Sequence, residues 1–197
     1  MRARGGGRPS DAPMNVLRRR LLAAALLLAG GAQGQAGVPS EVVAALPGAR
    51  LQGAGLLRFL GLRVYDIRLW TGAIAVGADW AQAAATPLAL EIEYARALEG
   101  AQIAERTLKE MRRQAEIAAE VGVRWLVAMK QLLPDVRAGD RITGVHLPGE
   151  GARFFVNGRL QGDLRDADFA RLFFGIWLSP RTSEPALREA LLGLDSR

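Results

Sequence analysis

The sequence contains few side chains whose types and spacing could carry out chemistry. His146 is the only histidine, cysteine is absent, and there is no phosphate-binding loop, nucleophile elbow or zinc-binding His-Glu-x-x-His segment. These features exclude a thiolate nucleophile and a metal site built from cysteine or histidine. We therefore expect no metal and no cofactor. His146 alternates with Val145 and Leu147, which is typical of an ordinary sheet residue rather than of a catalytic base.

A second candidate group lies in the segment GLRVYDIRLW, residues 61–70, which is as apolar as a buried strand but also carries charges. Side chains two residues apart share one face of a strand, so Asp66 and Arg68 lie on one side and Tyr65 on the other. Asp66 and Arg68 can form a partly shielded ion pair, or they can point into an apolar cleft and hold a ligand's carboxylate or carbonyl. Tyr65 is expected to be a core ring whose hydroxyl needs a partner.

A third candidate group follows a predicted helix over residues 99–120, in which apolar residues recur every three or four positions. A polar stripe lies beside the apolar face and would either line a cleft or border the solvent. Its members are Ile103, Thr107, Glu110 and Gln114. Two arginines near predicted strands, Arg58 and Arg96, are further candidate anion-binding groups, with ordinary sheet-edge charges as the alternative.

Hydrophobic periodicity predicts the elements that position these residues. Strands are expected over 49–59, 60–71, 87–96, 140–148 and 152–164, with helices at about 99–120, 122–133 and 166–174 and after Ser183. The Asn157-Gly158 pair between apolar flanks predicts a hairpin turn. Two groups of strands with helices between and after them indicate the α+β class, with an antiparallel sheet covered on one face by helices.

Residues 1–36 differ in composition from the remainder of the chain. Three arginines at positions 18–20 precede an apolar run over 21–29 and then small residues, which is the pattern of a cleavable secretory signal. The run is shorter than the roughly 20 residues that a bilayer span needs. We expect cleavage between Gly34 and Gly37, a periplasmic or secreted protein, and no stable membrane anchor after cleavage.

Removing this leader changes the charge balance of the chain. The whole sequence has 26 basic and 20 acidic residues, but residues 37–197 have 20 and 19. A nearly neutral domain lacks the positive surface that nucleic-acid binding requires, so nucleic acid is excluded as a partner. Residues 37–197 are long enough for one domain with a substantial core.

Four longer segments, taken in order, resemble the bacterial chalcone isomerase-like family. They are LQGAGLLRFLGLRVYDIRLW, LEIEYARALEGAQIAERTLKEM, PDVRAGDRITGVHLPGEGARFFVNGRLQG and FARLFFGIWLSPRTSEPALREALLG. The resemblance covers nearly all of residues 46–193. It implies an open-faced β-sandwich, in which a long antiparallel sheet is covered on one face by helices and an apolar ligand cleft lies between the two layers. Proteins of this fold include plant enzymes that cyclise flavonoids and relatives that bind fatty acids.

The resemblance also implies which residues take the active-site positions of the plant enzymes. Their substrate-orienting arginine falls near Pro47 and their strand threonine on Leu60. Their helix tyrosine falls on Ile103 and their asparagine on Glu110. These replacements remove the hydroxyl and amide donors that polarise a chalcone carbonyl. We therefore expect a cavity without those donors and no chalcone cyclisation.

Together these patterns predict an exported, non-catalytic protein that binds a small apolar or amphipathic ligand, such as a fatty acid. The predicted ligand-binding residues are Tyr65, Asp66, Arg68, Ile103, Thr107 and Glu110. The alternative is an isomerase or intramolecular lyase acting on an unknown substrate, with Glu110 as general base and Arg58 or Arg68 as electrophilic partner. A third hypothesis is an envelope accessory protein that acts through its surface rather than through a cleft.

Overall fold

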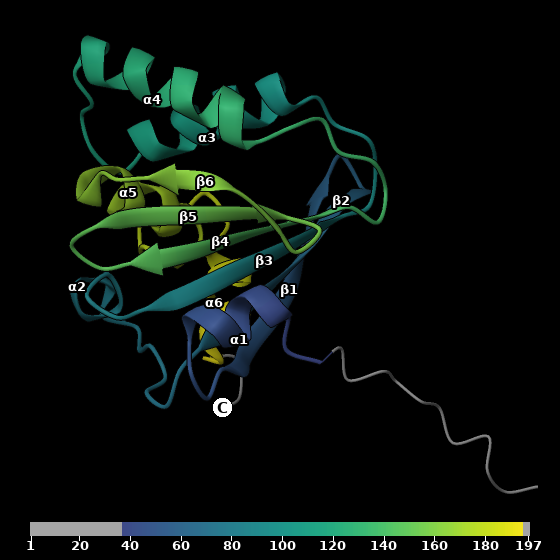
Figure 1. Cartoon of the computed structure of the whole chain (residues 1–197), viewed down its shortest axis with the longest axis vertical. Coiled ribbons are helices and arrows are strands. Elements are labelled where there is room, and N and C mark those ends of the chain that lie inside the picture. Colours follow the sequence, from purple (N-terminus) through teal and green to yellow (C-terminus); the bar gives the residue numbers. More distant parts are fainter. Residues whose placement is uncertain (1–36, 195–197) are drawn as a thin grey trace, which may run out of the picture. The chain divides into compact units, whose positions relative to one another are not determined.

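The computed structural model describes residues 37–194, and the predicted signal peptide lies outside them. In this part of the chain six strands form one antiparallel sheet whose spatial order follows the sequence (Figure 1). The strands are β1 (Arg50–Phe59), β2 (Leu62–Thr71), β3 (Leu88–Tyr94), β4 (Arg141–Leu147), β5 (Gly151–Val156) and β6 (Arg159–Leu164). The helices are α1 (Ser40–Ala45), α2 (Trp80–Ala83), α3 (Gly100–Arg112), α4 (Ala119–Leu132), α5 (Ala167–Leu178) and α6 (Pro185–Leu192). The predicted α+β class is confirmed.

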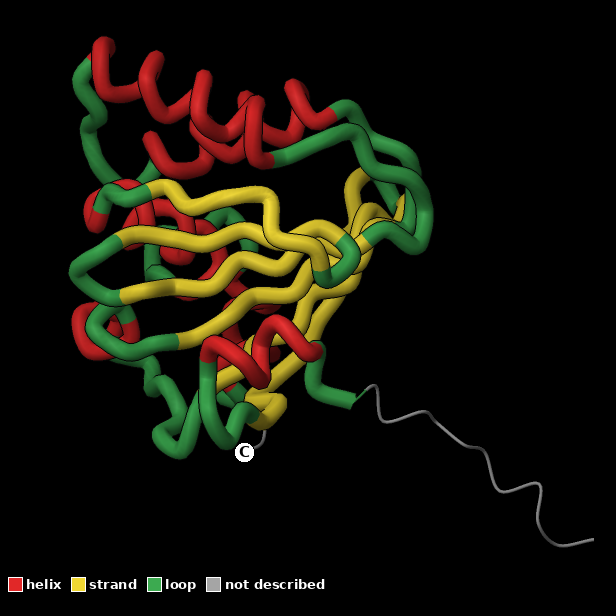
Figure 2. Tube along the Cα trace, in the orientation of Figure 1, coloured by secondary structure: helices red, strands yellow, loops and turns green. Residues whose placement is uncertain are grey.

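Helices cover the two faces of the sheet unequally (Figure 2). The main core is formed by one face of the sheet with α3, α4, α5 and α6, and it includes aromatic side chains such as Phe154 and Phe169. The other face carries only the short helix α1, whose Val42 packs with Trp70 and Val145. The open-faced arrangement expected from the sequence is therefore present, with α1 as an element that the sequence analysis did not predict. None of the helices described is both long and apolar enough to cross a bilayer.

Two tight hairpins connect neighbouring strands at the ends of the sheet. Between β5 and β6 the turn residues Asn157 and Gly158 have φ values of 49° and 80°, as the sequence predicts, because asparagine and glycine tolerate this left-handed conformation. Between β1 and β2 the residues Leu60 and Gly61 adopt nearly the same conformation, with φ values of 49° and 78°. The β1–β2 ladder also contains a register shift between Leu57 and Arg58.

The first long helix is shorter than its apolar periodicity predicts. It ends at Arg112, because the backbone carbonyl and the side-chain amide of Gln114 bond to other parts of the chain. The side chain of Gln114 donates to the carbonyl of Leu172 at 2.7 Å, and Arg181 donates to the carbonyl of Gln114. The chain therefore leaves the helix here and packs against α5 before α4 begins at Ala119.

Helix α5 continues beyond the predicted end at Phe174 to Leu178. Its N-terminus is capped by Asp166, whose Oδ1 accepts from the backbone N–H of Phe169 at 3.0 Å, which satisfies one of the free amide groups of the first turn. The segment FFGIWL within α5 forms much of the aromatic core. Its Phe173 stacks on Phe169 with ring centroids 5.6 Å apart.

Candidate ligand-binding cavity

A cavity of about 440 Å³ lies between the sheet and the helix layer. Its walls come from β1, β2, β3, β4, α3, α5, the end of α4 and the segment before α6. Apolar side chains of the wall include Leu57, Val64, Ile92, Ile103, Phe173 and Ile176. Polar groups of the wall include Arg58, Tyr65, Tyr94, Arg96, Arg106, Thr107, Glu110 and Ser183. Small-molecule sites commonly have volumes of about 300–1,000 Å³ and a few polar groups in an apolar wall, so this cavity has the dimensions and composition of such a site.

Tyr65 and Trp177 form the polar centre of the cavity. The indole Nε1–H of Trp177 donates to the hydroxyl of Tyr65 at 2.9 Å. Because Tyr65 is the acceptor in this bond, its own hydroxyl hydrogen is free to be donated to a ligand. Burial raises the pKa of Tyr65 to about 12, despite the opposing effect of the Trp177 bond. Tyr65 therefore stays a neutral donor at physiological pH.

Tyr94 lies beside Tyr65 in the cavity wall. The two rings meet edge to face with centroids 6.1 Å apart, which is a favourable aromatic geometry. Burial, followed by the proximity of Tyr65, raises the pKa of Tyr94 above its ordinary value. Both phenols therefore remain protonated over the physiological pH range.

Glu110 on α3 is buried and accepts from several donors at once. Its Oε1 lies 2.9 Å from Arg106 Nη2, and its Oε2 accepts from Ser183 Oγ at 2.9 Å. Arg113 Nε lies 3.5 Å from the same Oε2. The contact with Ser183 joins α3 to the segment before α6. Together the contacts of Glu110 occupy the carboxylate oxygens that a general base would need to have available for a substrate.

Three arginines from different elements line the cavity: Arg58 of β1, Arg96 after β3 and Arg106 of α3. Arg106 is paired with Glu110. Among the described residues, neither Arg58 nor Arg96 has a carboxylate within ion-pair distance. The wall thus includes cationic groups that could bind an anion together with the Tyr65 hydroxyl.

The structure places four predicted binding residues in the cavity wall and two elsewhere. Tyr65, Ile103, Thr107 and Glu110 line the cavity, although the Thr107 hydroxyl donates its hydrogen to the carbonyl of Ile103 at 2.8 Å. Their roles in binding stay predictions. Arg58, which the alternative enzymatic hypothesis assigns as an electrophilic partner, also lies in the wall.

Asp66 and Arg68 do not reach the cavity, which corrects their assignment as ligand-binding residues. Strand alternation directs Tyr65 to the helix side, so the residues at 66 and 68 lie on the opposite face of β2. Arg68 Nη1 lies 3.2 Å from Glu91 Oε1 and 3.3 Å from Glu93 Oε2, whereas Asp66 pairs with Arg63. The charges of the segment 61–70 therefore serve ion pairs, but not the Asp66–Arg68 pair that the sequence suggested.

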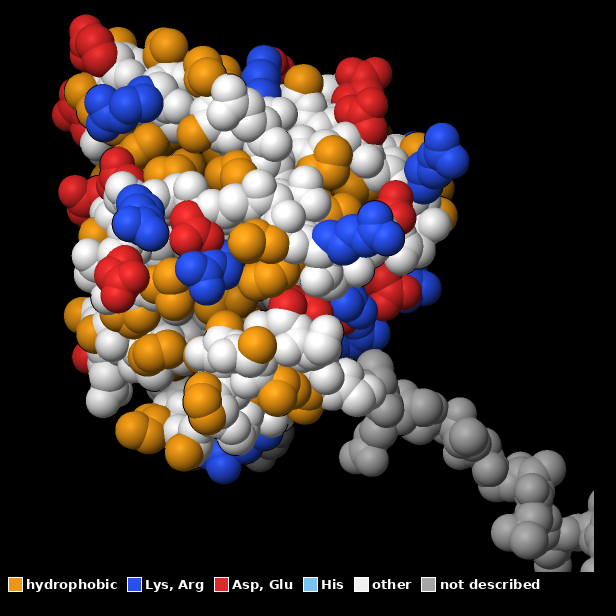
Figure 3. Space-filling view, in the orientation of Figure 1, with side chains coloured by type: hydrophobic (Ala, Val, Ile, Leu, Met, Phe, Trp, Pro, Cys, Tyr) orange, Lys and Arg blue, Asp and Glu red, His pale blue; other side chains and the backbone are white. Residues whose placement is uncertain are grey.

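A network of buried charge on the α1 face was also not predicted. Glu91 Oε2 accepts from the Trp70 indole at 2.7 Å. Glu41 Oε1 accepts from Arg141 Nη2 and from Thr143 Oγ1, each at 3.0 Å. Charged side chains of both signs gather over this face (Figure 3). The network holds α1 on the sheet, because Glu41 belongs to α1 and its partners belong to β4.

The expectation that the cavity lacks arginine and hydroxyl donors is wrong. Pro47 and Leu60, which the resemblance placed at the active-site positions, are not among the residues that line the cavity. The strand residues that line it are instead Arg58 and Tyr65. Donors are therefore present, but they come from sequence positions other than those matched to the plant enzymes. The sequence argument against chalcone cyclisation, which rested on their absence, does not hold.

His146 lies outside the cavity wall, in the core between β4 and α5. Its ring packs against Phe174 with centroids 4.9 Å apart, and its Nδ1 lies 3.2 Å from the carbonyl oxygen of Thr86. Burial lowers the pKa of His146 below its ordinary value. The structure thus places the single histidine as a packed sheet residue.

Comparison with known proteins agrees with the fold. The chalcone isomerase-like family model matches residues 33–193. The chain belongs to the chalcone isomerase-like family. An uncharacterized protein of Haemophilus influenzae is 31% identical over 107 residues, which make up 54% of this chain and 52% of that protein. The chain thus spans about half the length of this relative.

A solved structure shares the fold of this family member. The crystal structure of a fatty-acid binding protein from Arabidopsis thaliana matches with a TM-score of 0.60 and 14% sequence identity. The match covers 75% of this chain and 89% of the plant chain. At this identity the likeness establishes a common fold.

Proposed function

We propose that this protein binds an amphipathic acid, such as a fatty acid, in the cavity and releases it unchanged. The observation that carries the proposal is the Tyr65 hydroxyl in a largely apolar cavity. It accepts from Trp177 Nε1–H at 2.9 Å and donates to no other described residue. The name of the Arabidopsis protein of the same fold, a fatty-acid binding protein, supports the same class of ligand.

The polar groups of the wall suit a carboxylate. A hydrogen bond from Tyr65 and attraction from Arg58, Arg96 or Arg106 would together satisfy the two carboxylate oxygens. A charge-assisted bond of this kind is worth about 1.5–3 kcal/mol. The raised pKa of Tyr65 supports this role, because a deprotonated phenol would repel the acid.

The apolar part of the wall suits a hydrocarbon chain. Ile92, Ile103 and Phe173 are among the side chains that would cover it. Each methylene group transferred from water into such surroundings contributes about 0.8 kcal/mol. Micromolar binding corresponds to a net free energy of about 8 kcal/mol. Because association itself costs at least about 4 kcal/mol, a hydrocarbon chain of about a dozen or more methylene groups is needed beside the carboxylate contacts.

Binding without catalysis is favoured over the alternative isomerase or lyase activity. Glu110, the general base of that alternative, already holds Arg106 and Ser183. Of its two proposed electrophilic partners, Arg68 lies on the other face of the sheet, whereas Arg58 lines the cavity. An isomerisation needs a basic group and an electrophilic group of the protein that both contact the same bound substrate. Turnover of any bound compound that is lost in Glu110→Gln would instead favour the enzyme.

We also propose that the protein acts outside the cytoplasm. The arginines at 18–20 followed by the apolar run at 21–29 support export through a cleavable signal. Cell fractionation followed by N-terminal sequencing would test this proposal. We expect a processed chain starting between Gly34 and Gly37 in the periplasm or medium, and an unprocessed cytoplasmic chain would contradict it.

Calorimetric titration with straight-chain fatty acids and with alcohols of the same length tests the binding proposal. We expect micromolar or tighter binding of an acid and at least about tenfold weaker binding of its matched alcohol, because the alcohol lacks the charge that the arginines attract. Equal affinity for acid and alcohol, or no binding of either, would contradict the proposed recognition.

A further inference from the structure

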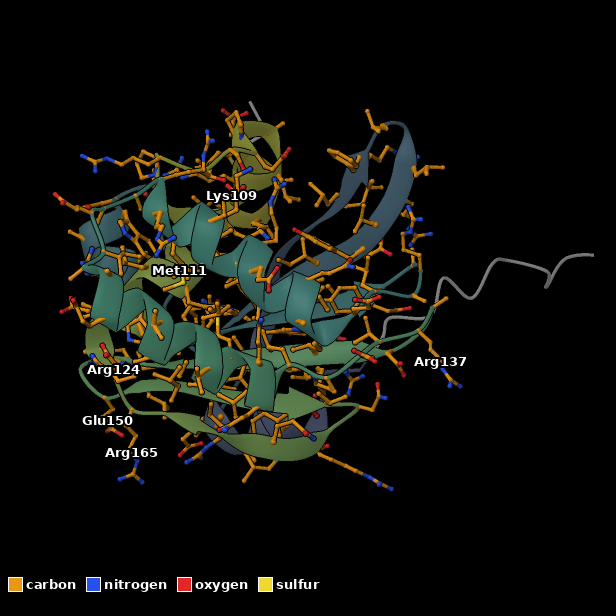
Figure 4. The ribbon with its side chains drawn as sticks, turned by 90° about the horizontal axis from the view of Figure 1, so that it is seen from above. Lys109, Met111, Arg124, Arg137, Glu150 and Arg165 are labelled. Atoms are coloured by element: carbon orange, nitrogen blue, oxygen red, sulfur yellow. The ribbon has the colours of Figure 1, made fainter. Side chains whose placement is uncertain are left out.

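The tip of the β1–β2 hairpin exposes large apolar side chains. Leu60 is 86% exposed, Phe59 60% and Leu62 57%. Phe59 pairs with Leu62 in the ladder, so Leu60 and Gly61 form the turn between them. The hairpin that these residues close lies at the periphery of the molecule, beside the helices, when it is seen from above (Figure 4). We name residues 58–63 the hairpin tip.

Leu60 occupies a position that neither packing nor backbone preference favours. Its φ of 49° lies in the left-handed region, which is strained for residues with a branched or bulky side chain. The same turn conformation between β5 and β6 is formed by Asn157 and Gly158, which are the residues preferred there. Because the Leu60 side chain is almost fully exposed, its apolar surface is available to a partner.

Two arginines form the next residue pair of the ladder after the Phe59–Leu62 pair at the tip. Arg58 and Arg63 are directly opposite each other in the ladder, an arrangement that is destabilising for like charges. Arg63 has Asp66 as a partner. Arg58 donates only to the turn carbonyl of Gly61, at 3.4 Å, among the described residues. An external anion would relieve the repulsion between the two guanidinium groups.

We propose that the hairpin tip docks on the surface of a membrane that contains anionic phospholipids. Phe59, Leu60 and Leu62 would enter the acyl-chain boundary, and Arg58 and Arg63 would meet the lipid phosphates. This order of groups matches interfacial segments, in which apolar side chains insert and basic side chains remain at the headgroups.

The tip is continuous with the cavity, which gives the docking a consequence for the proposed function. Leu57, Arg58 and Phe59 belong to the cavity wall. A bilayer beneath the tip would therefore lie next to the cavity, and an amphipathic acid could pass between them with little exposure to water. A second copy of this chain docked tip to tip is a poorer partner, because it would bring two further arginines against Arg58 and Arg63.

The absence of cysteine from the sequence allows a direct test. Leu60→Cys in the full chain is labelled with an environment-sensitive fluorophore and mixed with vesicles of phosphatidylglycerol and phosphatidylethanolamine. Leu160→Cys is the matched control, because Leu160 is 59% exposed on β6 at the opposite edge of the sheet. We expect a blue shift and quenching by spin-labelled lipid at position 60 and neither at position 160. Equal responses at both positions, or none at 60, would overturn the proposal.

The variant Leu60→Asn provides a second test, because this substitution should leave the fold intact. Asparagine tolerates the left-handed turn, so the melting temperature should not fall. We expect at least about tenfold weaker partition of this variant into the anionic vesicles than of Leu160→Asn, because one leucine side chain no longer enters the apolar layer. Unchanged partition would contradict the proposal. A dimer seen by analytical ultracentrifugation that Leu60→Asn dissociates, without vesicle binding, would also overturn it in favour of a second copy.

Membrane docking and ligand binding can fail independently in these experiments. Leu60 is not part of the cavity wall, so Leu60→Asn should bind a fatty acid in solution with unchanged affinity. If the wild-type protein binds no fatty acid, the proposed function is refuted, whereas the result with vesicles is unaffected. Fatty-acid binding without any response of the probe at position 60 would refute only the docking.

Discussion

Replacing Tyr65 with phenylalanine removes a single oxygen atom and tests both the stability and the binding chemistry of the cavity. In the wild-type protein this oxygen accepts from the buried Trp177 indole at 2.9 Å. Without it the indole N–H has no partner among the described residues, which costs about 1–3 kcal/mol. For a domain of this size we expect the melting temperature to fall by about 3–8 °C.

The same substitution should weaken binding of a fatty acid. It removes the hydroxyl hydrogen that we assign to the ligand carboxylate, a charge-assisted bond worth about 1.5–3 kcal/mol. The dissociation constant measured by calorimetry should therefore rise by about tenfold to a hundredfold. Affinity for the alcohol of the same length should change less, because the alcohol makes a weaker hydrogen bond.

Tyr94→Phe is the matched control for this experiment. It removes a hydroxyl from the same cavity, but no hydrogen bond joins that hydroxyl to another described residue. Its melting temperature should stay within a degree or two of the wild type. If Tyr65→Phe is as stable as Tyr94→Phe and binds the acid with wild-type affinity, the assignment of Tyr65 as the carboxylate donor is refuted.

Three further predictions follow from other groups in the structure. Ile103→Trp should fill the cavity and weaken acid binding by calorimetry at least about tenfold with a native circular dichroism spectrum; unchanged affinity would show that the ligand binds elsewhere. Glu110→Gln should tighten acid binding severalfold, because Arg106 loses the carboxylate 2.9 Å away, and weaker binding would contradict this electrostatic role. Burial lowers the pKa of His146, so below about pH 6.5 the unfolded state binds more protons than the folded state. The free energy of unfolding measured in urea should therefore be full above about pH 6.5 and decline as the pH falls. If His146→Gln shows the same decline between about pH 6.5 and 5.5, His146 is not its cause.

Local sequence signals predict the fold well where one short segment determines the geometry. The Asn157-Gly158 turn is an example, because its left-handed conformation is preferred by these two residues alone. The Leu60-Gly61 turn has the same geometry, but leucine carries no such preference, so only the flanking strands indicate it. Helix α1 was missed because its six residues are too short for a periodic pattern, and it is held by contacts of Glu41 with the distant strand β4.

The candidate site was predicted less completely, because it joins residues that are far apart in the chain. Strand alternation separates Tyr65 from Arg68, but it does not say which face of the sheet meets the helices. The bond from Trp177 to Tyr65 spans 112 positions, and the bond from Ser183 to Glu110 spans 73. No local pattern indicates such pairs. Helical periodicity put Ile103, Thr107 and Glu110 on one stripe but left open whether it lines a cleft or borders the solvent, and the family resemblance pointed to the cleft.

A crystal structure of the protein with hexadecanoic acid tests the central claim most directly. We expect the acid in the cavity, with one carboxylate oxygen about 2.5–3.0 Å from the Tyr65 hydroxyl and its hydrocarbon chain against Ile103 and Phe173. An empty cavity at saturating acid, or an acid whose carboxylate points away from Tyr65 and the wall arginines, would contradict the claim.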